Sequence, residues 1–164
     1  MSAFPTEPQT VTLCHGCAAS TGRCRLGLKT VSLDDAGAAC FELVCPSDHE
    51  GGPGVAHGGW TASLMDEVLG QIVVLNGQAA IVGTLTTVFL RPVPVGYPVF
   101  ARSWIERRQA RKWHVAGELR LRNRNLVLAR AQGIFVLRDG AAHYKQFADW
   151  LSEQPRPTDH TEDG

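Results

Sequence analysis

The sequence predicts an α+β fold in which one long central helix is covered by a curved antiparallel sheet of about five to six strands. Two observations lead to this prediction. Apolar side chains recur at helical spacing from Trp60 to Leu75, with no proline and one glycine in that stretch. Four later segments show strand-like composition or polar–apolar alternation, and short turns separate them. A helix this apolar must be covered, and one sheet packed on it is a stable layered solution.

Length and charge limit the classes of protein that the chain can belong to. Its 164 residues predict one domain, residues 1–164, with flexible tails at 1–10 and 152–164. The 16 basic residues balance 16 acidic ones, which argues against nucleic acid or a membrane surface as partner. No apolar run approaches the roughly 18 residues of a membrane span. The start lacks the pattern of a signal peptide, so we expect a cytoplasmic protein with reduced cysteines.

A cluster of cysteines follows the N-terminal tail. Cys14 and Cys17 form a CxxC pair around His15, and Cys24 lies seven residues further on. Zinc needs about four ligands, and the chain has neither a second CxxC nor an H-x₃₋₅-H pair. A redox CxxC would need a βαβ context, which is absent. We therefore predict no metal site and assign these cysteines no function.

The remaining elements follow in order. Leu28–Leu33 and Ala39–Val44 flank the turn sequence DDAG and predict a hairpin. The glycine-rich loop GGPGVAHGG leads into the helix, which starts near Gly58 and ends before Asn76. Four long strands then predict a meander, and a short terminal helix is expected at Lys145–Leu151. The four strands are Ile81–Leu90, Pro98–Arg107, Trp113–Arg122 and Leu126–Leu137.

The start of the central helix is a candidate site for a polarised carbonyl group or an anion. The first amides of a helix have no intrahelical acceptor and lie at its positive end. Gly58 and Gly59 would let another molecule approach these amides, which could then stabilise an oxyanion. The alternative interpretation is that the glycines only form a turn.

Two acids in the helix are candidates for catalysis. Asp66 lies nine residues after His57, at the edge of the apolar arc, with the small residues Ser63 and Gly70 one turn away. A carboxylate beside apolar surface that a substrate can reach is suited to act as general base or nucleophile. Glu67 points about 100° away from Asp66 and is the weaker candidate. From these residues alone, a solvated surface acid remains the alternative.

The string G-P-G-V-A-H-G-G with Asp66 downstream, followed by F-L-R-P-V at 89–93, resembles the hotdog-fold acyl-CoA thioesterases, in particular the phenylacetate-degradation-type (PaaI-like) group. The resemblance covers roughly residues 28–138. It implies hydrolysis of an acyl-CoA thioester without a cofactor beyond the coenzyme A of the substrate. It also implies a homodimer or homotetramer with sites at the subunit interface. The segment C-H-G-C followed by G-L is similar to an opening found in some members, but Arg23 and Cys24 stand where that opening has Asn-Pro.

The resemblance assigns roles to residues at the helix start. The thioester carbonyl would be polarised by backbone N–H groups near Gly59 and Trp60, and Asp66 would attack it or activate a water. His57 would either hold the loop or contact the thioester.

Further residues are candidates for binding substrate. Thr84 and Thr86 share a strand face and could meet the acyl group, although threonine is also an ordinary sheet former. Arginine and lysine suit the phosphates of coenzyme A, although a solvated turn charge is the alternative for each. The full set of binding candidates is Gly58, Trp60, Ser63, Thr84, Thr86, Arg91, Arg111 and Lys112.

Two other functions remain open. A hotdog domain could bind acyl-CoA without turnover, but an acid at the matching position, Asp66, argues for hydrolysis. Hotdog hydratases and dehydratases pair Asp and His at a different spacing from the one between His57 and Asp66. The acyl group is not indicated by the sequence.

Overall fold

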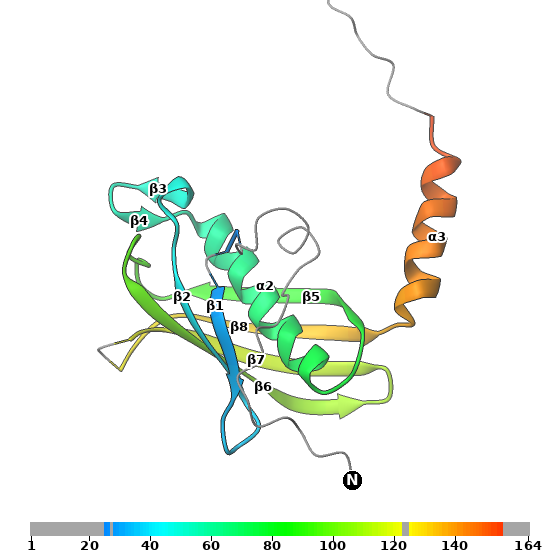
Figure 1. Cartoon of the computed structure of the whole chain (residues 1–164), viewed down its shortest axis with the longest axis horizontal. Helices are drawn as coiled ribbons and strands as arrows, with labels where there is room; N and C mark the ends of the chain where they lie inside the picture. Colours follow the sequence, from blue (N-terminus) through cyan, green and yellow to red (C-terminus); the bar gives the residue numbers. More distant parts are fainter. Residues whose placement is uncertain (1–24, 27, 123–124, 156–164) are drawn as a thin grey trace, which may run out of the picture.

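The computed structural model describes residues 25–26, 28–122 and 125–155, and its centre is a long helix on an antiparallel sheet (Figure 1). Helix α2 (Gly58–Leu75) packs on one face of six strands in the order β1-β2-β6-β7-β8-β5. The strands are β1 (Leu28–Leu33), β2 (Ala39–Val44), β5 (Ala80–Phe89), β6 (Pro98–Gln109), β7 (Lys112–Leu121) and β8 (Leu126–Leu137). The predicted fold class and hairpin are confirmed.

One step of the predicted topology is wrong. Strands β6, β7 and β8 form a meander, but β5 pairs with β8 rather than with β6, so β5 is an edge strand. The connection from Phe89 to Pro98 is too long for a tight hairpin and contains two prolines. Its backbone bonds elsewhere, because the Val95 amide donates to Gly54 and the Gly96 amide to Cys45. The connection therefore carries the chain across the end of the sheet.

The core lies between α2 and the sheet. Large apolar side chains from both layers are fully buried, among them Phe41, Leu64, Leu69 and Val115. The helix comes very close to the sheet at Gly117, where an added Cβ would lie 2.8 Å from Leu69 Cδ1. This close approach sets the distance between α2 and the sheet. It therefore also sets the position of every side chain of the helix relative to the strands.

A buried polar contact also ties the helix to the sheet. Ser103 on β6 donates its hydroxyl proton to the Val68 carbonyl oxygen at 2.8 Å, in the middle of α2. Since buried hydroxyl groups need a partner, this bond favours one register of the helix on β6.

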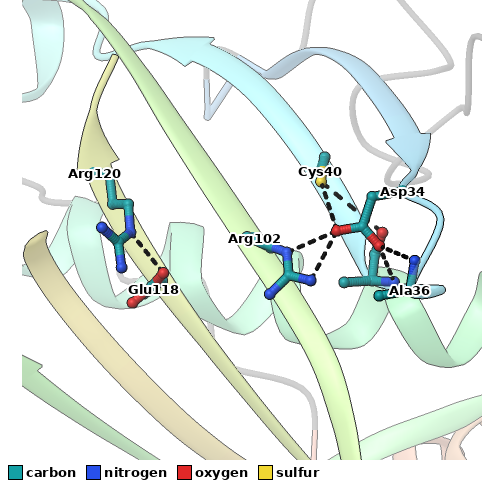
Figure 2. A network of polar contacts seen from close by, with 7 residues as sticks. Asp34, Ala36, Cys40, Arg102, Glu118 and Arg120 are labelled. Carbon is teal, nitrogen blue, oxygen red and sulfur yellow. Dashed lines mark hydrogen bonds and ion pairs between the residues drawn. The ribbon is translucent and has the colours of Figure 1, made fainter. Parts of the chain in front are cut away.

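The β1–β2 hairpin is fixed to β6 by an ion pair on the sheet face turned away from α2 (Figure 2). Arg102 on β6 bonds Asp34 at 2.8 Å, and Asp34 also accepts the backbone N–H groups of Ala36 and Ala38 in the turn. Both charged side chains are about one-third exposed, so the pair contributes little stability. The backbone pairing of β2 with β6 holds the hairpin, and the ion pair ties the turn of the hairpin to Arg102.

The segments outside the sheet differ from the predictions in two places. The glycine-rich loop contains a short hairpin, β3 (Glu50–Gly52) and β4 (Val55–Ala56), after a 3-10 turn at Ser47–His49. Helix α3 (Gly140–Ser152) is longer than the predicted Lys145–Leu151 and projects away from the sheet (Figure 1).

Some predictions fall outside the described part of the chain. The CxxC pair, Cys24, the first tail and the last nine residues all lie there, as does most of the NRN turn. Neither α-helix among the described residues combines the length and hydrophobicity that crossing a membrane requires.

Candidate active site

His57 caps the start of α2 with its side chain. Its Nδ1 accepts the Gly59 N–H at 2.9 Å, so the neutral imidazole has its proton on Nε2. The first helical bond runs from the Thr61 N–H to the His57 carbonyl oxygen at 3.2 Å. The amides of Gly58 and Trp60 precede this bond and have no intrahelical acceptor. In the described part of the chain the helix start therefore has free amides at Gly58 and Trp60, whereas the amide of Gly59 is already used by His57.

The loop before the helix needs glycine to bring His57 into place. A Cβ added to Gly51 would lie 2.7 Å from the Cα of His57, and one added to Gly59 would lie 2.9 Å from His57 Nδ1. The backbone N–H of His57 also donates to the His49 carbonyl oxygen at 2.8 Å. At these two positions of the predicted loop only glycine fits, because any larger side chain would collide with His57.

Asp66 is a partly buried carboxylate with an unpaired oxygen. Its Oδ1 is buried and has no hydrogen-bond partner among the described residues. Burial raises the pKa of the Asp66 carboxyl above its ordinary value. One turn before it, Ser63 is exposed and donates its hydroxyl proton to the Gly59 carbonyl oxygen at 2.9 Å. A buried carboxylate oxygen without a donor costs stability, and such groups concentrate at functional sites.

Glu67 differs from Asp66 in having a partner on the same helix. Gln71 donates a hydrogen bond from its side-chain amide to Glu67 Oε1 at 2.6 Å. The pKa of Glu67 is raised by burial and by the nearby Asp66 charge, against the lowering effect of the Gln71 bond. The structure thus separates the two acids: Glu67 is held in a local contact and Asp66 is not.

Trp60 was among the predicted binding residues, whereas Thr87 and Phe89 were not predicted as site residues. Trp60 is buried, and within residues 25–26, 28–122 and 125–155 neither its indole N–H nor the buried Thr87 hydroxyl on β5 has a hydrogen-bond partner. Phe89, at the end of β5, lies beside Gly58, yet 57% of its surface is exposed. Orphaned polar groups beside an exposed aromatic ring suit a ligand that is partly apolar and partly polar.

Thr84 and Thr86 lie on the other face of the sheet. Leu85 pairs with Gly133, which faces Leu69 of α2, so the flanking threonines point away from the helix. There Thr86 lines a shallow hollow with Arg130 and Gln132. Within one chain these threonines are therefore separated from Asp66 by the sheet. A bulge between Val82 and Thr84 shifts the alternation of β5, and Gly83, an isolated glycine inside the strand, is the sequence signal for it.

The basic candidates are divided between two ends of the sheet. Arg91 donates to the Val127 carbonyl oxygen at 2.6 Å, near the start of β8. Arg111, next to Lys112, donates to the Leu137 carbonyl oxygen at 3.2 Å, at the end of β8. All three basic side chains are exposed, and one chain does not bring the two groups together.

Comparisons with known proteins agree with the fold. A model of the thioesterase superfamily matches residues 53–128. The chain is 31% identical over 87 residues to acyl-coenzyme A thioesterase THEM5 of Mus musculus, covering 53% of this chain and 35% of that protein. It is 28% identical to the solved structure of RHA08564, a thioesterase superfamily protein, with a TM-score of 0.61 over 65% of this chain and 55% of that one.

The E. coli PaaI protein shows the same fold at 22% identity, with a TM-score of 0.61 over 68% of this chain and 83% of that one. The matched part spans little more than a third of the length of the curated relatives, 35% to 39%. The family match covers the β3–β4 loop, α2 and the strands that follow as far as the start of β8.

Proposed function

We propose that this chain, a hotdog-fold member of the thioesterase superfamily, hydrolyses an acyl-CoA thioester to a carboxylic acid and coenzyme A. The observation that supports this most is the unpaired Oδ1 of Asp66 on the helix whose N-terminus offers free amides. Within the superfamily, the spacing from His57 to Asp66 favours the PaaI-like group. The acid and the amides together provide a base or nucleophile and a site for an oxyanion.

The reaction starts with the thioester carbonyl at the start of α2. The amides of Gly58 and Trp60 stabilise the negative charge that develops on its oxygen. The amide of Gly59 can join them only if the His57 imidazole turns away. Either Asp66 attacks the carbonyl carbon, giving an anhydride that water then hydrolyses, or Asp66 takes a proton from a water that attacks directly. In both cases the C–S bond breaks, and coenzyme A leaves as thiolate and is protonated.

The proposed functional unit is a homodimer. Strand β5 is the edge of the sheet next to β8 and is exposed along most of its length. Pairing two β5 strands antiparallel across a two-fold axis would satisfy their free backbone groups and join two sheets into one. Such a dimer allows Asp66 of one subunit to act on a thioester held largely by the other. Further pairing of dimers would give a tetramer.

The same dimer would bring the two groups of basic residues together. Leu137, which accepts from Arg111, pairs with Ala80 at the start of β5. In an antiparallel β5 pair this start lies beside the end of the partner's β5, close to the partner's Arg91. Arg111 and Lys112 on one subunit and Arg91 on the other would then lie within a few strand spacings of about 4.8 Å. This is a suitable span for the phosphates of coenzyme A.

Thiol release from a panel of aromatic and aliphatic acyl-CoAs tests the proposal. The purified chain should hydrolyse at least one member, and Asp66→Ala should lose about two or more orders of magnitude in rate. Glu67→Ala is the matched control and should stay active. If the wild-type chain binds acyl-CoA but is inert across the panel, it is a binding domain. If Glu67→Ala is inactive and Asp66→Ala is not, Asp66 does not have the proposed role.

A further inference from the structure

Helix α3 has an apolar face that no other described residue covers. Tyr144, Phe147, Trp150 and Leu151 lie on one arc of the helix, and between 51% and 71% of each side chain is exposed. No residue of α3 is buried, and the helix stands clear of the sheet (Figure 1). Phe147 and Trp150 already contact each other, with ring centroids 5.9 Å apart. A cluster of four exposed large apolar side chains indicates an interaction surface.

The opposite face of α3 argues for a protein partner rather than a membrane. Lys145 and Asp149 form an ion pair there at 3.0 Å, and Gln146 lies between them in the sequence. A helix that binds anionic lipid typically has several lysines or arginines on its polar face. The polar face of α3 has one basic side chain, and an acid neutralises it.

The position of α3 in the fold indicates where the partner surface lies. The Arg138 N–H donates to the Ala79 carbonyl oxygen at 2.9 Å, so α3 begins beside the start of the edge strand β5. In the antiparallel β5 pair, this start adjoins the end of the partner's β5. A helix of 13 residues is roughly 20 Å long, which is enough to reach across the adjacent strand end.

The end of β5 presents a matching apolar surface. Phe89 is 57% exposed and Leu90 is 43% exposed. The ring of Phe89 lies beside Gly58, at the start of α2 where the thioester is proposed to bind. Two uncovered apolar surfaces, one at each end of the same edge strand, become neighbours when the strand pairs with its own copy.

We propose that α3 of one subunit packs on the partner's Phe89 and Leu90 and forms one wall of the entrance to the partner's site. The proposal depends on the β5-paired dimer of the proposed function, but not on hydrolysis. It assigns to α3 two effects: it extends the dimer interface beyond the strand pair, and it covers apolar surface where the acyl group enters.

A photo-cross-linking experiment tests the contact directly. The full-length chain is prepared with p-benzoylphenylalanine at Phe147, and copies labelled with ¹⁵N are mixed with unlabelled copies. Irradiation should give cross-linked peptides that join α3 of one label to residues 88–91 of the other. The same probe at Lys145, on the polar face, should give few such products. Cross-links within one copy only, or to other segments, would overturn the proposal.

Variants of the apolar face provide a second measurement. Phe147→Ser with Trp150→Ser should raise the dissociation constant of the dimer at least about tenfold in sedimentation experiments, because apolar contacts are lost. Lys145→Ser, on the polar face, should leave the dissociation constant unchanged. The core should stay folded, since α3 contributes no buried residue. An unchanged dissociation constant would refute the packing of α3.

These outcomes separate the two proposals. If the wild-type chain is monomeric at all concentrations, both the β5 dimer and the α3 contact are wrong. If it is a dimer whose cross-links avoid residues 88–91, only the α3 contact is wrong. If the contact forms but no acyl-CoA is hydrolysed, the α3 proposal stands and the thioesterase proposal fails.

Discussion

Replacing Asp66 by asparagine should make the protein more stable at neutral pH while it abolishes activity. The change keeps the shape of the side chain but removes a charge whose Oδ1 is buried without a partner. Burying an unpaired charge costs more than burying a neutral unsatisfied group, which itself costs about 1–3 kcal/mol. Asparagine leaves a neutral polar atom at the same place, so the gain is only the difference between these two costs. Because Asp66 is partly buried, we expect a gain of about 1 kcal/mol. Loss of the base or nucleophile should lower the rate by about two or more orders of magnitude.

The pH dependence of this gain follows from the direction of the pKa shift. Burial raises the pKa of Asp66 in the folded chain above the ordinary value of 3.8 that applies to the unfolded chain. The ionised carboxylate therefore destabilises the fold, and this penalty grows as pH rises through the interval between the two pKa values. The stabilisation by Asp66→Asn should be largest above the raised pKa. It should shrink as the pH falls and disappear below about 3.8.

Urea denaturation of both proteins from pH 7.5 downward measures the effect. A gain of about 1 kcal/mol moves the urea midpoint by about 0.5 M and the melting temperature by about 2–4 °C for a chain of this size. Glu67→Gln is the matched comparison: it can still accept the Gln71 bond, and because burial also raises the pKa of Glu67 it should gain stability with rising pH too, but it should keep its activity. The reasoning would be refuted if Asp66→Asn were less stable than wild type at pH 7.5, or if its gain were independent of pH.

Three further predictions concern the His57 cap of α2, the packing of α2 on Gly117 and the edge strand β5. His57→Ala removes the acceptor of the cap bond and should cost about 1 kcal/mol in chemical denaturation, whereas His57→Asn should restore most of it. Gly117→Ala places a Cβ 2.8 Å from Leu69 Cδ1 and should cost about 1–3 kcal/mol, while Gly140→Ala, with open space around it, should be neutral. Thr86→Lys puts like charges near the centre of the proposed β5 pair and should shift the protein to monomer in light scattering; an unchanged dimer would place the interface elsewhere.

Much of the fold follows from sequence periodicity. The predicted hairpin and the last strand, Leu126–Leu137, match the structure residue for residue, and the helix ends where the sequence NGQ begins. These elements have either clear alternation or strong turn signals at both ends. The place of β5 could not be predicted in the same way, because period-2 composition identifies a strand but not its neighbour. That neighbour is set by the long connection through Pro92 and Pro94.

The candidate site, like the fold, could be predicted only in part from the sequence. The helical period places Asp66 and Glu67 on different sides of α2, and in the structure only Glu67 has a side-chain partner on the helix. The cap by His57 was open to two interpretations, and the structure shows that it at least holds the loop. Thr87 was missed because the bulge before Thr84 sets which residues of β5 face α2. Gly83 is the sequence signal for this bulge, but a single sequence does not show which residues after it face the helix.

The close approach at Gly117 has a consequence for how this protein can change over evolutionary time. Leu69 lies three residues after Asp66 on the same helix. Gly117, against which Leu69 packs, therefore sets the distance of the Asp66 carboxylate from the sheet. Any side chain at 117 would lift or tilt α2 and move the carboxylate by a fraction of an ångström, without touching it. Selection for a different acyl group can thus act on the strand beneath the helix. Substitutions there would alter turnover while every residue of the site itself stays the same.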